Sequence, residues 1–348
     1  MRFSVMIWPH SGTTIEPVVN IARIAEECGF DTVYIGDSHM LWNDVYICLA
    51  YCAQATQRVR LSPGVTNPVT RHPAVTANAV MSVNMLSKGR AVLGIGAGDS
   101  AVRTTGLSPA KMTQLRDSVE FMRSLLSGQE VDVLRPTGAE ERKGWGQISR
   151  LRLHGAETWG NVPIEIAVMS PKAATMAGEI AEGVIVDGHM GGNAEGAAAT
   201  IAAASEGARR AGKDPTTLRF IAAIDAAIND NRTVALDKVR PTAARNIARK
   251  PWLPKTLAVD HAEIVARVSQ GYDFSQHLDL TASHRRLIPN EVAMKCTIAG
   301  TPQDCIAKAR ELQAAGMTDI GIFVTTQDEV GASITLQRFA REVIPYVA

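Results

Sequence analysis

The sequence predicts an α/β protein built as a single (β/α)8 TIM barrel with insertions. Short apolar segments recur eight times along the 348 residues, and amphipathic segments with apolar residues every three to four positions lie between them. The short segments are too apolar to keep one face in water. Strands that alternate with helices and are buried on both faces are typical of a closed parallel barrel.

The elements follow from the same patterns, taken in chain order. The eight predicted strands are residues 2–8, 31–36, 59–65, 91–96, 163–169, 183–188, 218–224 and 319–325. The predicted helices are residues 15–29, 44–57, 73–87, 109–127, 171–182, 194–212, 302–316 and 330–347. Ser108, Ser170 and Thr301 each precede a proline, so we expect each of them to cap a helix whose first residue is that proline.

The number of domains does not follow from the length alone, because 348 residues at roughly 150 per domain would also fit two domains. Barrels reach this length as one unit, so we predict a single barrel domain over residues 1–348. Two stretches break the alternation, at about 128–162 and 229–300, and are expected to be insertions. Insertions of this size form active-site lids or oligomer contacts, or they are solvated decoration.

Composition limits the function classes. Lys and Arg number 36 against 35 Asp and Glu, a formal charge of +1, so no bulk electrostatic attraction to nucleic acid or to an anionic membrane is expected. The five cysteines are scattered, which favours reduced thiols in the cytoplasm. The first apolar run stops at Pro9, too early for a signal peptide or a membrane span. A small-molecule ligand fits best.

Polar residues collect where the predicted strands end, which is the catalytic rim of such a barrel. Asp37 and His39 follow the second strand, and a histidine–carboxylate pair can move a proton near neutral pH, so they are the predicted catalytic residues. The alternative is a histidine bonded to a loop carbonyl and an aspartate that caps the next helix. His10 and His189 end the first and sixth strands and join the same rim.

Two further segments on this rim suggest a bound cofactor. Gly96, Gly98 and Asp99 resemble a dinucleotide-binding glycine pattern, but Asp99 stands where a third glycine is needed, which disfavours an NAD site. The glycines permit close approach to a flat ligand, or simply a tight turn. Ser170, Pro171 and Lys172 begin a helix directly after a strand and offer N–H groups, a hydroxyl and a cation to a phosphate. No metal-binding motif occurs, so no metal is predicted and an organic cofactor is expected to carry the chemistry.

Four segments together carry a family resemblance: DTVYIGDSHMLWNDVY (31–46), LSPGVTNPVTRHPAVTA (61–77), GRAVLGIGAGDSAV (89–102) and MSPKAATMAGEIAEGVIVDG (169–188). With AGTPQDCIAKARELQAAGMTDIGIF (299–323) they cover most of the chain in order. The chain resembles the bacterial-luciferase-like superfamily of flavin- and deazaflavin-dependent barrels, and within it the branch of methylenetetrahydromethanopterin reductase.

The resemblance implies where an isoalloxazine-type ring would lie. Gly64 and Val65 would form a non-prolyl cis peptide bond behind the ring, and Thr66 and Asn67 would bond its polar edge. Asp37 and His39 would face its reactive side. The remaining implied contacts are Gly96, Gly98 and Asp99 to the ring or side chain, and Met169, Ser170, Pro171, Lys172, Gly188 and His189 around the phosphate.

The chain departs from the family pattern at two places. Ser170 stands where a glycine is common before Pro-Lys, and the segment GDSHMLW replaces a shorter loop of the reductases. Met40 and Trp42 would therefore line a different substrate pocket, together with His10.

Two chemistries are compatible with the resemblance. A monooxygenase would use reduced FMN, supplied by a separate flavin reductase, with dioxygen and a small organic substrate. A reductase or dehydrogenase would use coenzyme F-420 and move a hydride to or from a carbon centre. We expect the FMN monooxygenase for two reasons. The loop after Asp37 differs from the loop of the reductases, and the sequence has no evident cluster of basic residues to bind an acidic cofactor tail. A non-catalytic flavin-binding protein is a third alternative. The apolar segment 44–57 suits a homodimer.

Overall fold

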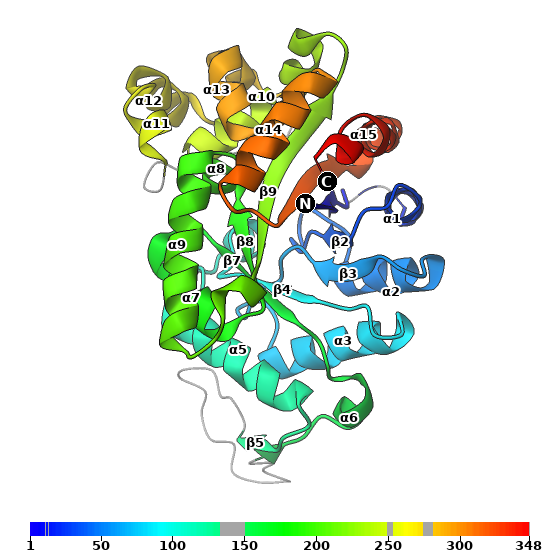
Figure 1. Ribbon diagram of the computed structural model, residues 1–348. Coiled ribbons are helices and arrows are strands. Elements are labelled where there is room, and N and C mark those ends of the chain that lie inside the picture. The colour runs from blue at the N-terminus through cyan, green and yellow to red at the C-terminus, as the bar shows by residue number, and fades with distance from the viewer. Residues whose placement is uncertain (11, 13, 133–149, 249–252, 274–280, 348) are drawn as a thin grey trace.

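Eight parallel strands form a closed ring at the centre of the molecule (Figure 1). The computed structural model describes residues 1–348 apart from 11, 13, 133–149, 249–252, 274–280 and 348. The neighbouring strands run in the order β3-β2-β1-β11-β9-β8-β7-β4, and isolated parallel bridges from Leu61 to Ala91 and from Thr66 to Ile95 join the two ends. The predicted (β/α)8 TIM barrel is therefore confirmed. Its strands are β1 Arg2–Trp8, β2 Thr32–Ile35, β3 Arg60–Pro63, β4 Leu93–Ile95, β7 Ile164–Val168, β8 Gly183–Asp187, β9 Arg219–Ile228 and β11 Asp319–Thr325.

The strands are buried on both faces, as their apolar composition predicts. Along β1, Met6 belongs to a cluster inside the barrel, whereas Val5 and Ile7 pack outward against the helices. Tyr34 and Ile185 face inward in the same way from β2 and β8. Because side chains alternate along a strand, each strand fills the barrel interior and also anchors the helical layer.

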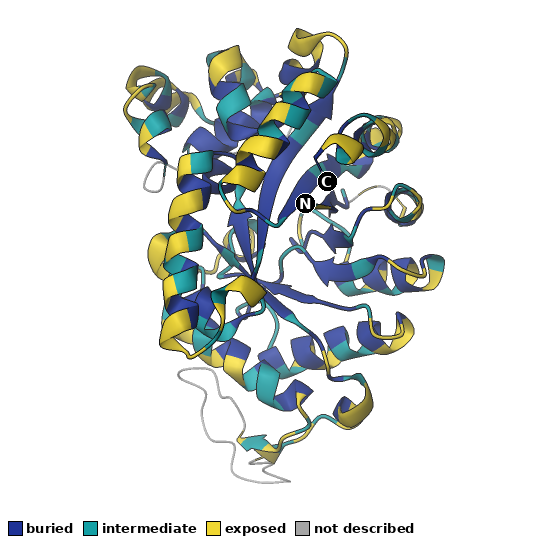
Figure 2. Cartoon of the chain, viewed as in Figure 1, coloured by how far each residue is buried: buried dark blue, intermediate teal, exposed yellow. Residues whose placement is uncertain are grey.

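The helices surround the strands and turn their buried faces inward (Figures 1 and 2). Every helix predicted from periodicity is present. These helices are α1 Glu16–Glu27, α2 Val45–Ala55, α3 Pro73–Leu86, α5 Met112–Leu126, α7 Pro171–Ile180, α9 Ala194–Arg210, α14 Pro302–Ala314 and α15 Glu329–Glu342.

Two of the three predicted helix caps are confirmed and one is wrong. The Ser170 side chain accepts a hydrogen bond from Ala173 N, and Thr301 caps α14 through a reciprocal pair with Asp304. Ser108 caps nothing, because α5 begins only at Met112. The preceding chain is held by a bond from Ala110 N to Ala97 O at 2.8 Å, which ties it to the loop after β4.

The two irregular stretches carry additional elements. Between α5 and β7 lie the antiparallel pair β5 Val131–Asp132 and β6 Arg150–Leu151, and then the short helix α6 Ala156–Trp159. Between β9 and α14 lie α10 Arg232–Ala248, α11 Lys255–Ala258, α12 Ala262–Gly271, α13 Asn290–Cys296 and β10 Ile298–Gly300, which pairs with β9. Helices α10 to α13 gather at the top of Figure 1 around an apolar cluster of their own. That all 348 residues form one domain stays a prediction.

A largely buried network of polar and charged residues fills the end of the barrel where the strands begin. We call Tyr34, Asp31, Glu165, Arg219 and Asp319 the polar plug. The Tyr34 hydroxyl donates to Glu165 Oε2 at 2.5 Å, and Arg219 donates to Asp31 at 2.7 Å and also to Asp319. The side chains of Glu165 and Asp319 are almost completely buried. The barrel is therefore closed at this end.

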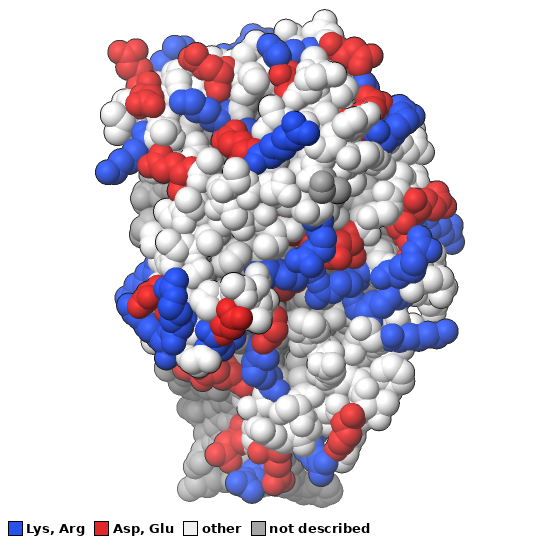
Figure 3. All heavy atoms as spheres, in the orientation of Figure 1, with Lys and Arg blue, Asp and Glu red and all other residues white. Residues whose placement is uncertain are grey.

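The surface carries both signs of charge. Lys and Arg are interspersed with Asp and Glu on the face seen in Figure 3, in keeping with the near-zero net charge. None of the helices in the described part of the chain is both long enough and apolar enough to cross a membrane.

Candidate active site

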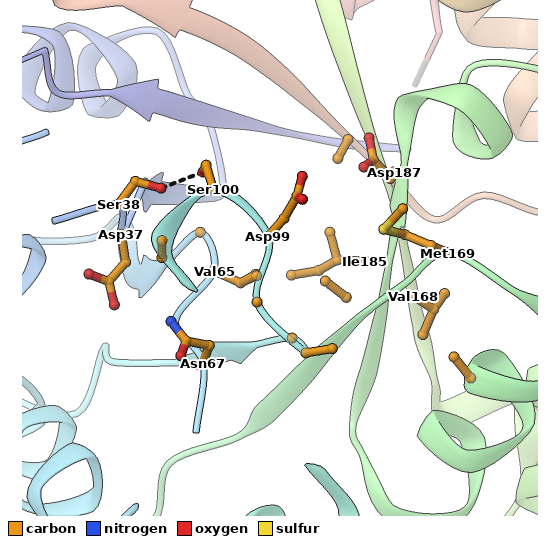
Figure 4. Close-up of a pocket in the computed structure, with 18 of the residues that line it drawn as sticks. Asp37, Ser38, Val65, Asn67, Asp99, Ser100, Val168, Met169, Ile185 and Asp187 are labelled. Atoms are coloured by element: carbon orange, nitrogen blue, oxygen red, sulfur yellow. Dashed lines mark hydrogen bonds between the residues drawn. The ribbon is translucent and has the colours of Figure 1, made fainter. Parts of the chain in front are cut away.

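A cavity of about 360 Å³ opens at the other end of the barrel, where the strands end. Its apolar wall is continuous with the barrel interior, because Met6, Ala167, Ile185 and Ala223 contribute to both. Figure 4 shows Asp37 and Asn67 on one side of this cavity and Asp187 and Met169 on the other. The polar lining residues are Asp37, Ser38, Asn67, Asp99, Ser100, Ser170, Asp187 and Arg245.

The structure brings ten of the predicted site residues together around this cavity: Asp37, Trp42, Gly64, Val65, Asn67, Gly96, Gly98, Asp99, Met169 and Ser170. Eight others do not line it: His10, His39, Met40, Thr66, Pro171, Lys172, Gly188 and His189. Met40 is 63% exposed, and Pro171 and Lys172 are also on the surface. Gly188 and His189 are buried within the short helix α8 Gly188–Gly191. The roles given to all of the predicted site residues, in the cavity lining or outside it, stay predictions.

Asp37 lies at the cavity wall between two basic side chains. Arg71 Nη1 is 2.6 Å from its Oδ2, and His39 Nδ1 is 3.3 Å from its Oδ1. The carboxylate is almost completely buried, so both contacts are shielded from solvent. Asp37 lines the cavity, whereas His39 contacts Asp37 without lining it.

The loop after β3 and the loop after β4 form a close-fitting shelf beside the cavity. The Gly64–Val65 peptide bond is cis, as the family resemblance implies. A Cβ at Gly96 would lie 3.1 Å from Val65 Cγ2 and 3.3 Å from Ala167 Cβ. Gly98 has a φ of +92°, which L side chains rarely adopt. A side chain at Gly96 would therefore crowd Val65 and Ala167, and the backbone conformation of Gly98 favours glycine.

The two polar atoms of the Asn67 side chain, Oδ1 and Nδ2, differ in their contacts. Its Oδ1 accepts from Val69 N and Thr70 N, both at 3.0 Å. Its Nδ2 is buried and has no hydrogen-bond partner in the part of the chain that the structure describes. A buried donor without a partner is costly, so Nδ2 is a natural contact for an acceptor atom of a ligand.

Two serines join loops from different strands across the mouth. Ser38, after β2, and Ser100, the first residue of α4 Ser100–Arg103, lie with their hydroxyl oxygens 2.5 Å apart (Figure 4). Both residues line the cavity, and Ser38 is almost fully buried. Asp99, beside Ser100, pairs with Arg103 at 2.9 Å on the solvent side.

Another part of the cavity lining is aromatic and carries one cation. Trp8 stacks on Trp42 with ring centroids 6.4 Å apart, and the Arg245 guanidinium lies 5.5 Å from the Trp8 centroid. Arg245 is the single basic residue among the described residues that line the cavity, and its Nη2 is 3.3 Å from Asp225 Oδ2. Burial raises the pKa of Asp225, while Arg245 opposes that rise.

No role at the site was predicted from the sequence for five residues: Ser38, Arg71, Ser100, Asp187 and Arg245. Ser38 and Asp187 each lie within two residues of the end of a predicted strand, so strand position was the available signal. Arg71 lies within the family-like segment TRHP. Arg245 comes from helix α10 in the second irregular stretch, and no motif marks it.

Comparison with known proteins agrees with this geometry. A family model described as "Luciferase-like monooxygenase" matches residues 1–319. The chain belongs to the luciferase-like family. It is 31% identical to a 5,10-methylenetetrahydromethanopterin reductase of Methanolobus tindarius over 318 residues, 88% of this chain and 90% of that protein.

Two other relatives of this luciferase-like protein are informative. An F420-dependent hydroxymycolic acid dehydrogenase of Mycobacterium tuberculosis is 29% identical over 278 residues, 73% of this chain and 74% of that protein. The coenzyme F420-dependent tetrahydromethanopterin reductase of Methanopyrus kandleri has the same fold, with a TM-score of 0.79, 21% identity and coverage of 100% of this chain and 99% of that one. This chain is accordingly a luciferase-like oxidoreductase.

Proposed function

We propose that this luciferase-like protein is an F-420-dependent reductase or dehydrogenase that moves a hydride to or from a carbon centre of a small substrate. The similarity to a reductase over 88% of the chain carries the proposal, and an F420-dependent dehydrogenase supports it. The expectation from sequence was an FMN monooxygenase. These relatives favour the alternative, although the loop after Asp37 departs from the reductases.

The residues at the cavity fit a flat ring. A Cβ at Gly64 would lie 2.6 Å from Tyr34 Cβ and one at Gly96 would lie 3.1 Å from Val65 Cγ2, so the shelf is closely packed, and Asn67 Nδ2 offers a donor that the protein leaves unpaired in its described part. The cavity wall beyond is apolar at Met6 and Ile185. A ring on this shelf would be held by shape and by one directed hydrogen bond.

The phosphate arm of the cofactor would extend toward α7. Ser170 lines the cavity and caps α7, where Pro171 has no N–H and Ala173 N and Ala174 N both donate to Ser170, so the Lys172 N–H is the backbone donor that this helix start offers. The Ser170 hydroxyl already accepts from Ala173 N at 3.2 Å, so its proton remains available to a phosphate oxygen. Lys172 is exposed and would reach a phosphate only near the cavity mouth.

The bound deazaflavin would supply the hydride chemistry, and the chain would supply position and proton control. Asp37, at the wall, would hold a polar group of the substrate, with His39 behind it. Trp8 and Trp42 would cover the substrate and exclude water. No residue has to act as a covalent nucleophile.

The identity of the cofactor decides whether a partner enzyme is needed. With F-420 no flavin reductase is needed, whereas an FMN enzyme would require one.

We also propose a homodimer through α2 and α3, which carry large exposed apolar side chains: Ile47, Tyr51, Val75, Met85 and Leu86.

Cofactor titration tests the proposal. Addition of the purified protein should quench the fluorescence of coenzyme F-420 with saturation, while oxidised FMN should bind much more weakly. Dioxygen uptake with reduced FMN, without any response to F-420, would replace this proposal with the monooxygenase. Failure to bind either cofactor would remove both enzymes and the flavin-binding alternative.

A further inference from the structure

Helix α10 of the second irregular stretch brings a buried cation to the cavity. The Arg245 side chain lines the cavity and is only 9% exposed. Its guanidinium lies 5.5 Å from the centroid of the Trp8 ring and 5.7 Å from that of Phe323. Burial of a charged group is costly unless its hydrogen bonds are made. The partners of Arg245 therefore indicate what this side chain is placed to bind.

Two neighbouring side chains use part of the hydrogen-bonding capacity of Arg245. Asn246 Oδ1 accepts from Nε at 3.3 Å and from Nη2 at 3.0 Å, and Asp225 Oδ2 accepts from Nη2 at 3.3 Å. Nη1 makes no hydrogen bond within the described part of the chain, and it is not one of the nitrogen atoms that are sealed from solvent. Since Arg245 lines the cavity and is otherwise almost completely buried, Nη1 is a donor that a ligand in the cavity can reach.

The order of the strands separates Arg245 from the proposed cofactor shelf. Its neighbours Phe323 and Asp225 belong to β11 and β9, whereas Gly64 and Gly96 of the shelf follow β3 and β4. In the closed order β3-β2-β1-β11-β9-β8-β7-β4, the strands farthest from β3 and β4 are β11 and β9. An atom bonded to Arg245 would therefore belong to a substrate that lies across the cavity from the cofactor ring.

The charges around Arg245 favour a ligand atom without a charge. Asp225 Oδ2, at 3.3 Å, already offsets the guanidinium. A carboxylate or phosphate at Nη1 would face further like charges, whereas a carbonyl oxygen accepts the same hydrogen bond and adds none. The other titratable residues of the described cavity lining are all acidic: Asp37, Asp99 and Asp187.

We propose that Arg245 determines substrate specificity, because its Nη1 donates to an uncharged acceptor oxygen of the substrate, such as a ketone, ester or amide oxygen. The inference rests on the proposed function in one respect, namely that this substrate reacts with the cofactor on the opposite shelf. The two aromatic rings and the two hydrogen-bonded side chains hold the guanidinium before a ligand arrives. Little side-chain freedom is then lost on binding.

Three probes of similar shape test this assignment on the protein without cofactor. Acetophenone carries a carbonyl oxygen, ethylbenzene carries no oxygen, and benzoate carries a negative charge. Ligand-observed NMR titration measures their affinities. Wild-type protein should bind acetophenone more tightly than it binds the other two.

Arg245→Met keeps the length of the side chain but removes the donor. It should weaken acetophenone binding by about tenfold or more, because a hydrogen bond from a charged group is lost, and it should leave ethylbenzene binding nearly unchanged. Arg103→Met, which removes the cation beside Asp99, is the matched control and should alter neither affinity.

Substitution of Asp225 tests the charge argument and guards against a folding defect. Arg245→Met leaves Asp225 buried without its cation, so the double variant Arg245→Met, Asp225→Asn removes both charges and should show the same loss of acetophenone binding. Asp225→Asn alone leaves the cation without its counter-charge and should bind benzoate more tightly than wild type does. Equal benzoate affinities for these two proteins would contradict the charge argument.

Three other results would overturn the assignment. Wild-type protein that prefers benzoate to acetophenone would show that the site selects an anion. Wild-type protein that does not bind acetophenone would remove the acceptor site. If Arg245→Met and the double variant weaken ethylbenzene as much as acetophenone, Arg245 shapes the cavity and donates to no ligand.

Fluorescence of F-420 separates this inference from the proposed function. Arg245→Met should quench it with the same affinity as wild type, and weaker F-420 binding by this variant would assign Arg245 to the cofactor and overturn the inference. Wild-type protein that binds acetophenone through Arg245 but does not bind F-420 would keep the specificity residue and lose the proposed function.

Discussion

The Asn67 side-chain amide has an acceptor oxygen and a donor nitrogen, and a substitution can remove one while keeping the other. Oδ1 holds the loop by accepting from Val69 N and Thr70 N, while Nδ2 has no hydrogen-bond partner among the described residues and is proposed to meet the cofactor. An aspartate at this position has almost the same shape and keeps both acceptor contacts. It removes the donor and adds a negative charge beside the proposed ring.

We therefore expect Asn67→Asp to weaken F-420 binding by about tenfold or more, since one lost hydrogen bond costs roughly 1 kcal/mol and the added charge adds to it. Fluorescence titration measures the affinity. Asn78→Asp, on the exposed face of α3, adds the same charge away from the cavity and should leave the affinity unchanged. Equal affinities for the two variants would remove Asn67 from the cofactor site.

Glu165 in the polar plug links stability to pH. Burial, aided by Asp319 and Asp31 and opposed by the Tyr34 hydroxyl, raises its pKa to about 8 from a usual value of 4.5. Between these two values the folded protein binds more protons than the unfolded chain. The contribution of this carboxyl to stability is therefore fully present below pH 4.5 and is lost as pH rises through 8.

Urea unfolding should accordingly show a free energy that falls between pH 5 and pH 8, by at most about 1.4 kcal/mol per pH unit for this one proton. Glu165→Gln keeps a neutral hydrogen-bonding side chain beside Tyr34 and should flatten the slope. Glu206→Gln, at an exposed position of α9, provides the comparison. Parallel slopes for wild type and Glu165→Gln would show that other groups carry the dependence.

Single residues of the site were predicted where they lie next to a strand end. Asp37, Asn67 and Asp99 follow recognisable strands and do line the cavity. His39 was expected beside Asp37 at the same rim, and it contacts Asp37 without lining the cavity, so its catalytic role stays a prediction. Arg71 and Arg245 act across the fold, and a contact between distant segments leaves no local pattern in a single sequence.

At the scale of elements, α7 and α9 pack closely enough to require glycine. A Cβ at Gly178 would lie 1.9 Å from Ala204 O, and one at Gly207 would lie 1.9 Å from Thr175 O. Each helix therefore presents a small residue to the backbone of the other. This pair supports the start of α7, where the phosphate is proposed to bind.

Gly178→Ala should destabilise the protein by about 2 kcal/mol. Overpacking typically costs about 1–3 kcal/mol and here it meets a rigid carbonyl, whereas the gain in helix propensity is only about 1 kcal/mol. Urea unfolding measures the loss. Ala199→Ser, on the exposed face of α9, should change stability by less than about 0.5 kcal/mol. A stabilised Gly178→Ala would mean that the two helices can separate freely.

Elements with a clear period were predictable, and short ones were not. All eight barrel strands and eight helices appear near their predicted positions, because burial on both faces of a strand and on one face of a helix gives distinct patterns. The four-residue helices α4, α6 and α8 have no period to detect. The start of α5 was misplaced because a tertiary contact, from Ala110 N to Ala97 O, prevails over the local Ser-Pro signal.

For the whole molecule, the exposed apolar side chains of α2 and α3 predict self-association. Ile47 is 52% exposed and Tyr51 is 57% exposed, one helical turn apart. The double variant Ile47→Glu, Tyr51→Glu should shift a dimer toward monomer in sedimentation experiments. Val259→Glu, which changes an equally exposed apolar side chain on the second irregular stretch, should leave the mass unchanged. A monomeric wild-type protein would contradict the proposed homodimer.

The polar plug also has a kinetic consequence. Because the polar plug fills the end of the barrel where the strands begin, we expect cofactor and substrate to enter and leave the cavity from the end where the strands finish, where Ser38 and Ser100 lie. A ring on the Gly64–Val65 shelf lies deeper than a substrate covered by Trp42. Turnover should then follow a compulsory order, with cofactor first to arrive and last to depart, and product-inhibition patterns of a random mechanism would contradict it. A shared entrance would make cofactor and substrate bind one after the other.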